Sequence, residues 1–286
     1  MNLQKIPTII LCGGQGTRLK EETEYRPKPM VEVGGKPLLW HIMKNYDHYG
    51  YNKFLLALGY KGNYIKDFFM SQETYLSDFT LHTRTGETAM HNRQHEDDFE
   101  ITFVDTGQET LTGGRVVRLR DYIDSDLFMV TYGDGLSNVD IEALIKFHKE
   151  KGVVGTITGV SPSSKFGLVE VDNNNIVHGF QQKPKNHDYI NGGFMVFDKR
   201  FFDYLHEDDM IEHGFLRLVE AGELALFPHE GFWFAVDTMR DLDEANRLWD
   251  EEGGPWANWC NVGQRQAAGL AQETSGEAFL KKINEV

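Results

Sequence analysis

Apolar residues along the first two hundred positions form short runs that alternate with segments of helical spacing. The runs are nearly free of polar residues, which is typical of strands buried on both faces of a parallel sheet. We predict such strands at 7–12, 53–58, 100–104, 127–131 and 153–160, and helices at 37–49, 64–69 and 141–149. This order predicts right-handed β–α–β crossovers, and therefore an α/β fold with a Rossmann-like, mixed but mostly parallel sheet flanked by helices.

The pattern changes beyond residue 166. Shorter apolar segments at 168–171, 176–182 and 190–197 alternate with turns, which predicts a small antiparallel elaboration on the same sheet. After residue 261 Gly, Gln and Ala dominate until a helix candidate at 277–283. We therefore predict one domain over residues 1–261 and a C-terminal extension over 262–286.

The charge balance narrows the class of ligand. Lys and Arg number 29 against 44 Asp and Glu, giving a net charge of −15. Such a chain is a poor binder of nucleic acid. Two cysteines make no disulfide framework and favour a reducing compartment. No segment approaches the roughly 20 apolar residues of a membrane span, so we expect a soluble, cytoplasmic protein with no membrane partner.

Two unusual loops follow predicted strand ends, where ligands bind in open α/β sheets. The first contains Gly13, Gly14 and Gly16, whose amides can cradle phosphate, although glycines alone are equally typical of a plain tight turn. Arg18 adds a bidentate phosphate donor. Lys28 lies between two prolines that stiffen its backbone, which favours a binding role.

These residues belong to a longer series of segments that together resemble a known family. The segments LCGGQGTRL, RPKPMVEVGGKPLLWHI, TGGR, TYGDG, INGGFMVF and GFW, in order over residues 7–259, resemble the sugar-phosphate nucleotidylyltransferases. Within that family the WHIMK, TYGDG and TGGR segments are most similar to members that use CTP. The resemblance implies Mg²⁺-assisted transfer of a cytidylyl group from CTP to α-D-glucose 1-phosphate, giving CDP-glucose for polysaccharide biosynthesis and pyrophosphate.

The resemblance also implies roles for individual residues. Lys28, Arg18 and Asp134 are expected to be catalytic, and Asp134 and Asp237 to bind the metal. The expected sugar-phosphate ligands are Lys183, Gln182, Asn191 and Gly192. The expected nucleotide ligands, besides Arg18 and Lys28, are Leu11, Cys12, Gly13, Gly14, Gln15, Gly16, Thr17, Thr112, Gly113, Arg115 and Gly133, with Gly114 in the same TGGR segment.

Several of these residues have simpler interpretations. Asp134 lies in a Gly-Asp-Gly turn, and Asp237 is placed to cap a helix. Lys183 is compatible with a solvated loop, and Gln182 stands where the family has a glutamate. Asn138 is predicted to cap the helix at 141–149.

His91 and His95, followed by Glu96, Asp97 and Asp98, have helical metal spacing but lack the HExxH pattern, so a solvated polar loop is favoured.

Other functions remain open at this stage. The same fold serves other nucleotides or other phosphorylated acceptors, and a nucleotide-sensing subunit without turnover is an alternative of another class. A dehydrogenase is disfavoured because GGQGTR lacks the GxGxxG spacing. We further expect a homo-oligomer, since relatives form hexamers and four of five tryptophans, after residue 230, suit either a core or subunit contacts.

Overall fold

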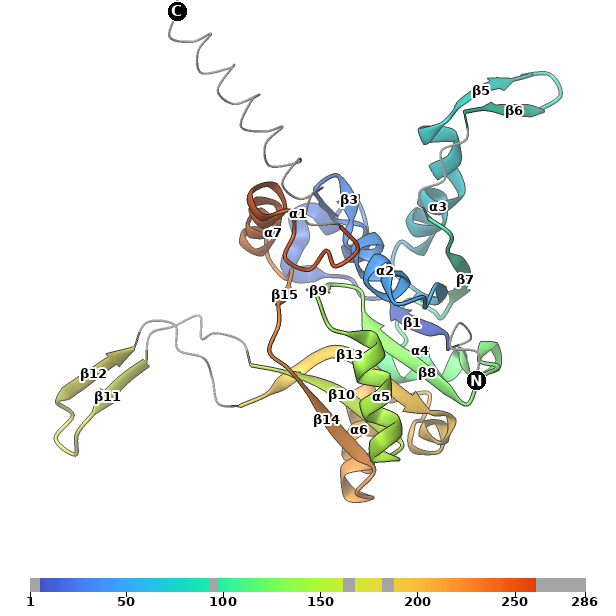
Figure 1. Cartoon of the computed structure of the whole chain (residues 1–286). Coiled ribbons are helices and arrows are strands. Elements are labelled where there is room, and N and C mark those ends of the chain that lie inside the picture. The colour runs from blue at the N-terminus through green and yellow to red at the C-terminus, as the bar shows by residue number, and fades with distance from the viewer. Residues whose placement is uncertain (1–5, 93–96, 162–167, 182–187, 261–286) are drawn as a thin grey trace, which may run out of the picture.

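The computed structural model describes residues 6–92, 97–161, 168–181 and 188–260. At its centre is a seven-stranded sheet in the order β14-β10-β13-β8-β1-β4-β7 (Figure 1). In that sheet β13 pairs antiparallel with both neighbours, and the other neighbouring strands pair in parallel. The expected mixed, mostly parallel sheet is therefore confirmed.

The bounds of the central strands follow the apolar runs closely. They are β1 Thr8–Leu11, β4 Lys53–Leu58, β7 Glu100–Asp105, β8 Leu127–Tyr132, β10 Gly155–Val160, β13 Ile190–Asp198 and β14 Leu224–His229. The helices are α1 Lys20–Thr23, α2 Leu38–His48, α3 Gly62–Leu76, α4 Thr112–Arg118, α5 Ile141–Lys151, α6 Ile211–Glu220 and α7 Met239–Glu252.

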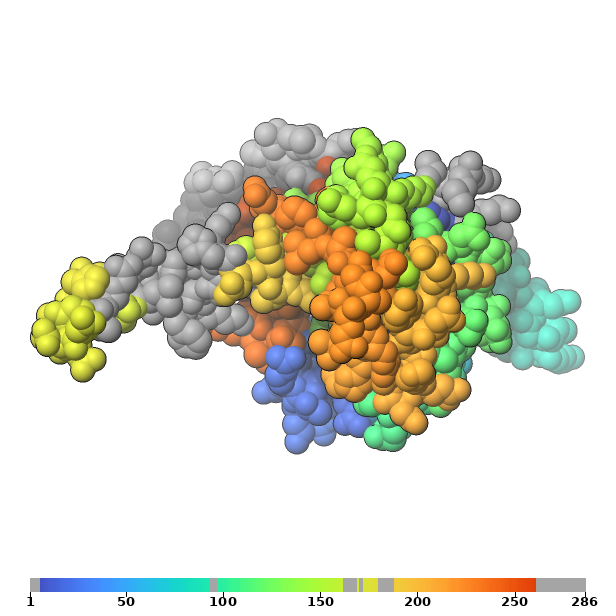
Figure 2. Space-filling view, turned by 90° about the horizontal axis from the view of Figure 1, so that it is seen from below, coloured from blue at the N-terminus to red at the C-terminus, as the bar shows by residue number. Residues whose placement is uncertain are grey.

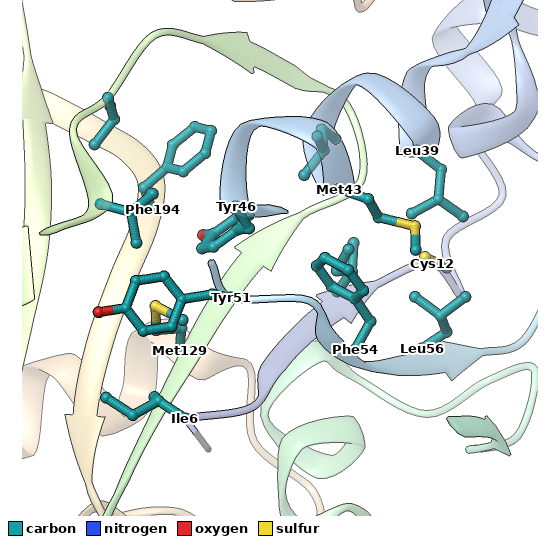
Figure 3. Packing of buried hydrophobic residues seen from close by; sticks show 14 of the residues in the cluster. Ile6, Cys12, Leu39, Met43, Tyr46, Tyr51, Phe54, Leu56, Met129 and Phe194 are labelled. Carbon is teal, nitrogen blue, oxygen red and sulfur yellow. The ribbon is translucent and has the colours of Figure 1, made fainter. Parts of the chain in front are cut away.

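Successive strand residues point to opposite faces of the sheet, so each face has its own core. Ile10, Leu56 and Met129 pack against α2, α3 and α5 in the cluster shown in Figure 3. Their neighbours Ile9 and Leu55 pack on the other face, against α4 and α6. Because both faces are covered, the strands carry apolar residues throughout rather than at alternate positions.

A third apolar cluster lies beyond the carboxyl ends of β1 and β8. It joins α7 to the loops after β1 and β8, and Trp256 at its centre is 1% exposed. Trp249 and Trp259 pack against the same cluster, and Trp233 against the core on the α2 side. Trp256 is thus a core residue of this chain, whereas the other three tryptophans are only partly buried.

Within the described residues, four two-stranded sheets accompany the central one. They are β2 Glu32–Val33 with β3 Lys36–Pro37, β5 Asp78–Leu81 with β6 Thr88–His91, β9 Gly135–Ser137 with β15 Trp233–Ala235, and β11 Leu168–Val171 with β12 Val177–Gln181. The β5–β6 and β11–β12 hairpins protrude from the body (Figures 1 and 2).

Three predictions need correction. Of the antiparallel segments, only β13 joins the central sheet, because β11 and β12 pair with each other alone. Helix α3 continues to Leu76, well beyond the predicted 64–69; the prediction ended too early because residues 70–76 bury no side chain and show no apolar periodicity. The cap of α5 is Asp140, whose carboxylate accepts from Ala143 N at 2.8 Å, because a cap must directly precede the first helical residue.

Asn138 has a different task. Its Oδ1 accepts a hydrogen bond from Phe232 N, which ties β9 to the segment before β15. His91 lies exposed in β6, whereas His95 and the helix candidate at 277–283 fall outside the described residues.

Candidate active site

The carboxyl ends of β1 and β8 border a cavity of about 420 Å³. Leu11 and Tyr132 are paired partners at these ends, so the loops that follow the two strands leave the sheet side by side. Most of the residues singled out in the sequence line this cavity. The lining residues are Leu11, Cys12, Gly13, Gly14, Gly16, Thr17, Arg18, Lys28, Pro29, Thr110, Leu111, Thr112, Arg115, Tyr132, Gly133, Asp134 and Met210.

The glycine loop after β1 is shaped by close backbone contacts. Gly16 has a φ of +62°, which side chains rarely allow. A Cβ there would lie 2.9 Å from the Cβ of Lys28. Glycine at this position therefore lets the loop close tightly over the Lys28 stem. Gln15, by contrast, is exposed and does not line the cavity.

Arg115 braces the same loop from α4. Its side chain is buried, and its guanidinium donates to the carbonyls of Gly13 (3.2 Å), Leu58 (3.0 Å), Gly107 (2.8 Å) and Gln108 (3.1 Å). A fifth bond reaches Thr106 Oγ1 at 2.7 Å. These contacts hold together the loops that follow β1, β4 and β7, so the geometry makes Arg115 a support of the loop.

Lys28 occupies the centre of the charged part of the site. It begins a short 3-10 turn, Lys28–Met30, and follows Pro27 in extended conformation. Its ammonium donates to Asp134 Oδ2 and to Asp237 Oδ1, each at 2.7 Å. The exposed Arg18 donates to the other oxygen of Asp237 at 3.1 Å. Two cations and two carboxylates, far apart in sequence, thus meet beside the glycine loop.

The pairing of β9 with β15 brings the two aspartates together. Gly135 pairs with Ala235, and Val236 N donates to the carbonyl of Asp134 at 3.1 Å. Helix α7 is capped by a reciprocal box between Thr238 and Asp241. Because Thr238 performs the capping, the side chain of Asp237 remains available to face Lys28.

The two carboxylates suit a divalent cation. Asp134 Oδ2 and Asp237 Oδ1 both converge on one ammonium, so they point to a single position. Mg²⁺ prefers oxygen ligands and usually takes one or two protein carboxylates, with phosphates and water completing its shell. No cluster of three or more His, Cys, Asp or Glu able to hold a metal occurs in the described part of the chain. The residues therefore fit an ion that is shared with a phosphorylated ligand.

A second side of the site faces β13. Asn191 and Gly192 lie at its start, beside the end of β8, and Asn191 Nδ2 donates to the Tyr132 hydroxyl at 3.4 Å. Gly192 supplies a carbonyl that accepts from Trp233 Nε1 at 2.8 Å. Gln182 and Lys183 lie outside the described residues.

Some predicted residues have local structural roles. Gly113 and Gly114 sit behind Thr112, where a Cβ would meet the carbonyls of Asp209 (2.7 Å) and Glu207 (2.0 Å). Thr112 Oγ1 accepts from Ile211 N at 2.9 Å. Together these contacts dock the start of α4 onto the start of α6.

Buried titratable groups at the cavity remain protonated. Burial raises the pKa of the Cys12 thiol, and the side chain packs in the core (Figure 3). Burial also raises the pKa of the Tyr132 hydroxyl, and the charge of Glu212 adds to that shift. Neither group is suited to act as a nucleophile.

Sequence reasoning missed Pro29, Thr110, Leu111, Tyr132 and Met210 at the cavity. Tyr132 directly precedes Gly133 and Asp134, which is a signal that was there to be used. Pro29 directly follows Lys28 and carries the same kind of signal. Thr110, Leu111 and Met210 come from the segments before α4 and α6, so their approach to the cavity depends on the packing of these helices.

The fold and the site define a nucleotidyl transferase: residues 7–252 match the model of that family, and the chain belongs to it. The protein is accordingly an enzyme whose substrates are a nucleotide and a sugar phosphate. Among its relatives are the "Probable glucose-1-phosphate cytidylyltransferase" of Bacillus subtilis, 44% identical over 88% of this chain and 99% of the relative, and the "Glucose-1-phosphate cytidylyltransferase" of Salmonella typhi, 42% identical over 88% and 98%.

A solved structure supports the fold. HddC from Yersinia pseudotuberculosis superposes with a TM-score of 0.63 over 85% of this chain and 99% of that one, at 24% identity. Among the described helices, none is both long and apolar enough to cross a membrane.

Proposed function

We propose that this protein transfers a cytidylyl group from CTP to α-D-glucose 1-phosphate, releasing pyrophosphate and CDP-glucose. The relatives that share 42–44% of its residues carry the name of that activity. The observation that carries the proposal is the Lys28 ammonium, held between Asp134 and Asp237 directly beneath a glycine loop.

The reaction requires no covalent bond to the protein. An oxygen of the sugar phosphate attacks the α-phosphorus of CTP, and the bond from that phosphorus to the bridging oxygen breaks to release pyrophosphate. The attacking oxygen already carries negative charge near neutral pH, so no side chain has to remove a proton. Catalysis then consists of holding two anions together and stabilising the charge that moves between them.

The residues of the nucleotide side divide this task. Backbone amides of Gly13, Gly14 and Gly16, which line the cavity, are assigned to the triphosphate, together with the exposed Arg18. Lys28 is assigned to the α-phosphate, because its ammonium lies at the junction of the loop and the carboxylates. Arg115 supports the loop, and Thr112 borders the nucleotide side of the cavity.

Mg²⁺ is the cofactor that the site implies. The positive charges of Lys28 and Arg18 are balanced by the carboxylates of Asp134 and Asp237. These four groups therefore offer no net positive charge to two phosphorylated substrates. Asp134 and Asp237 are the residues that would hold the ion. When bound, Mg²⁺ neutralises phosphate charge and fixes the orientation of the phosphate groups.

The acceptor is assigned to the side of the site formed by β13. Asn191 and Gly192 are proposed to contact the sugar, and Gln182 and Lys183 its phosphate and hydroxyls. The boundary between a domain of residues 1–261 and an extension of residues 262–286 stays a prediction. So does the homo-oligomer, for which the exposed Met70, Tyr75 and Phe79 of α3 and β5 offer apolar surface.

Pyrophosphate release with a matrix of substrates tests the proposal. CTP, UTP, dTTP, ATP and GTP are each combined with several sugar 1-phosphates in the presence of Mg²⁺. We expect the highest kcat/KM for CTP with α-D-glucose 1-phosphate, and loss of release when the metal is chelated. A different preferred pair would change the assigned substrates, and no release with any pair would favour a sensor of nucleotides.

A further inference from the structure

A chain of hydrogen bonds runs along the β13 side of the cavity. Tyr132 ends β8, lines the cavity and directly precedes Gly133 and Asp134. Its hydroxyl donates to Glu212 Oε1 at 2.8 Å and accepts from Asn191 Nδ2 at 3.4 Å. Three elements, β8, α6 and β13, thus meet through one phenol oxygen.

The ring of Tyr132 is held in place from β13. It packs closely against Gly193, where a Cβ would lie 2.7 Å from the ring carbon Cδ2. Gly193 has a φ of +84°, and its N–H donates to Asn191 Oδ1 at 3.0 Å. That bond fixes which end of the Asn191 amide faces Tyr132, so the Nδ2 group points to the hydroxyl of this cavity-lining residue.

Glu212 determines the direction of the hydrogen bonds that Tyr132 makes. An ionised carboxylate only accepts hydrogen bonds, so the Tyr132 proton is committed to Glu212 and the phenol oxygen keeps its acceptor capacity for other groups. The second oxygen, Oε2, is buried and has no hydrogen-bond partner among the described residues. A buried carboxylate oxygen without a partner is costly, and such a cost is found where function requires the group.

We propose that Tyr132 and Glu212 determine which acceptor the enzyme uses, an inference that rests on the proposed transfer to a sugar 1-phosphate. Tyr132 offers one acceptor, its phenol oxygen, and Asn191 offers one donor, the second N–H of its amide. A sugar hydroxyl is both donor and acceptor, so one ring hydroxyl matches the pair, replacing the long 3.4 Å contact between them. Glu212 is the positioning residue, because it acts through Tyr132.

Tyr132 and Asn191 should discriminate strongly between a sugar that has this hydroxyl and one that lacks it. A site built to bond a hydroxyl rejects an analogue that lacks it, because its own polar groups are then left unpaired. The enzyme should therefore use at least one monodeoxy form of its sugar 1-phosphate poorly. An apolar surface in place of Tyr132 and Asn191 would not discriminate in this way between the sugar and its deoxy analogue.

The test combines enzyme variants with substrate variants. Wild type, Tyr132→Phe, Glu212→Ala and Glu212→Gln are each assayed with the preferred sugar 1-phosphate and with its monodeoxy analogues. Glu220→Gln, at the exposed far end of α6, is the matched control. The affinity for CTP is measured in parallel, and it also reports that each variant is folded.

We expect one monodeoxy analogue to lose about 10-fold or more in kcat/KM with wild type, as the loss of one hydrogen bond implies. With Tyr132→Phe the kcat/KM for the parent sugar phosphate should fall by a similar factor, chiefly because KM rises. The difference in kcat/KM between parent and analogue should then vanish. Glu212→Ala should behave likewise, whereas Glu212→Gln should recover part of the difference because its amide oxygen still accepts from Tyr132. CTP affinity and the Glu220→Gln enzyme should stay within about 2-fold of wild type.

The inference is overturned if Tyr132→Phe keeps the wild-type ratio between parent and every monodeoxy analogue. It is also overturned if the variant loses CTP affinity while discrimination among acceptors is unchanged, since Tyr132 would then serve the nucleotide. Both outcomes leave transfer itself intact. The proposed function would fail separately, through the absence of transfer to any sugar phosphate by wild type.

Discussion

Arg115 shows how a single residue can matter to a site without needing to touch the ligand. Its guanidinium fills the space that glycines leave open, since a Cβ on Gly13 would lie 2.0 Å from Arg115 Nη1 and one on Gly59 2.6 Å. The fork of donors satisfies four carbonyls and one hydroxyl from three loops. A lysine has a compact ammonium with three donors and cannot reproduce that fork.

Replacing Arg115 by lysine should therefore loosen the glycine loop. We expect Arg115→Lys to lower the free energy of unfolding by about 2–4 kcal/mol, since buried acceptors lose their donors, and to raise the KM for CTP. Arg118→Lys on the same helix is the control, because Arg118 is half-exposed and its loss should cost less than about 1 kcal/mol. Urea denaturation measures both, and equal stabilities for the two variants would contradict the bracing role.

At this scale the sequence was partly sufficient. The prolines around Lys28 and the glycines before Arg18 pointed to the site from residue chemistry alone. The pairing of Asp134 with Asp237 came from the family resemblance, because it depends on the distant contact between β9 and β15. Asn138 was assigned the wrong role, since capping is decided by the residue next to the helix and Asp140 occupies that place.

At the scale of elements, buried strands were the most predictable part of the chain. β4 begins and ends where its apolar run does, because a continuous apolar segment bounded by polar residues leaves little freedom. The short strands β5, β6, β9 and β15 were missed, as three or four residues carry no measurable period. Two of these, β9 and β15, are the elements that bring the aspartates together, so the part that positions the site was the least predictable.

The N-terminal cap of helix α7 helps to position Asp237 in the site. Thr238 Oγ1 and Asp241 satisfy the first turn reciprocally, and Asp237 stands one residue before this cap. The cap thereby fixes the backbone at the point from which Asp237 reaches Lys28. An alternative in which Asp237 itself capped the helix would have spent its oxygens on backbone amides.

At the scale of the whole molecule, two buried histidines link stability to pH. His41 contacts Val33 O at 2.8 Å and Trp256 Nε1 at 3.2 Å, and His148 contacts Thr156 Oγ1 at 2.9 Å. Burial lowers the pKa of each to about 4 from the usual 6.5. Between these values the unfolded chain binds protons that the folded chain does not, so stability is full above pH 6.5 and falls as the pH drops toward 4.

The free energy of unfolding should accordingly decrease by up to about 1.4 kcal/mol per pH unit for each histidine within that window. Urea denaturation at steps between pH 4.5 and 7.5 measures the slope. His148→Gln should reduce it, whereas His82→Gln, at an exposed position, should leave it unchanged. A slope that is the same in wild type and His148→Gln would contradict this assignment.

The central claim is that Lys28, Asp134 and Asp237 form the centre that transfers the nucleotidyl group. Its most direct test is turnover beside CTP affinity in Lys28→Ala, Asp134→Asn and Asp237→Asn, with Mg²⁺ saturating. We expect Lys28→Ala to lower kcat/KM by about 100- to 1000-fold, as when one key stabilising donor is lost, while CTP binding weakens much less because the glycine loop and Arg18 remain. Both aspartate variants should lose Mg²⁺-dependent turnover with the fold intact. Near wild-type turnover in Lys28→Ala, or full activity in either aspartate variant, would contradict the account at that residue.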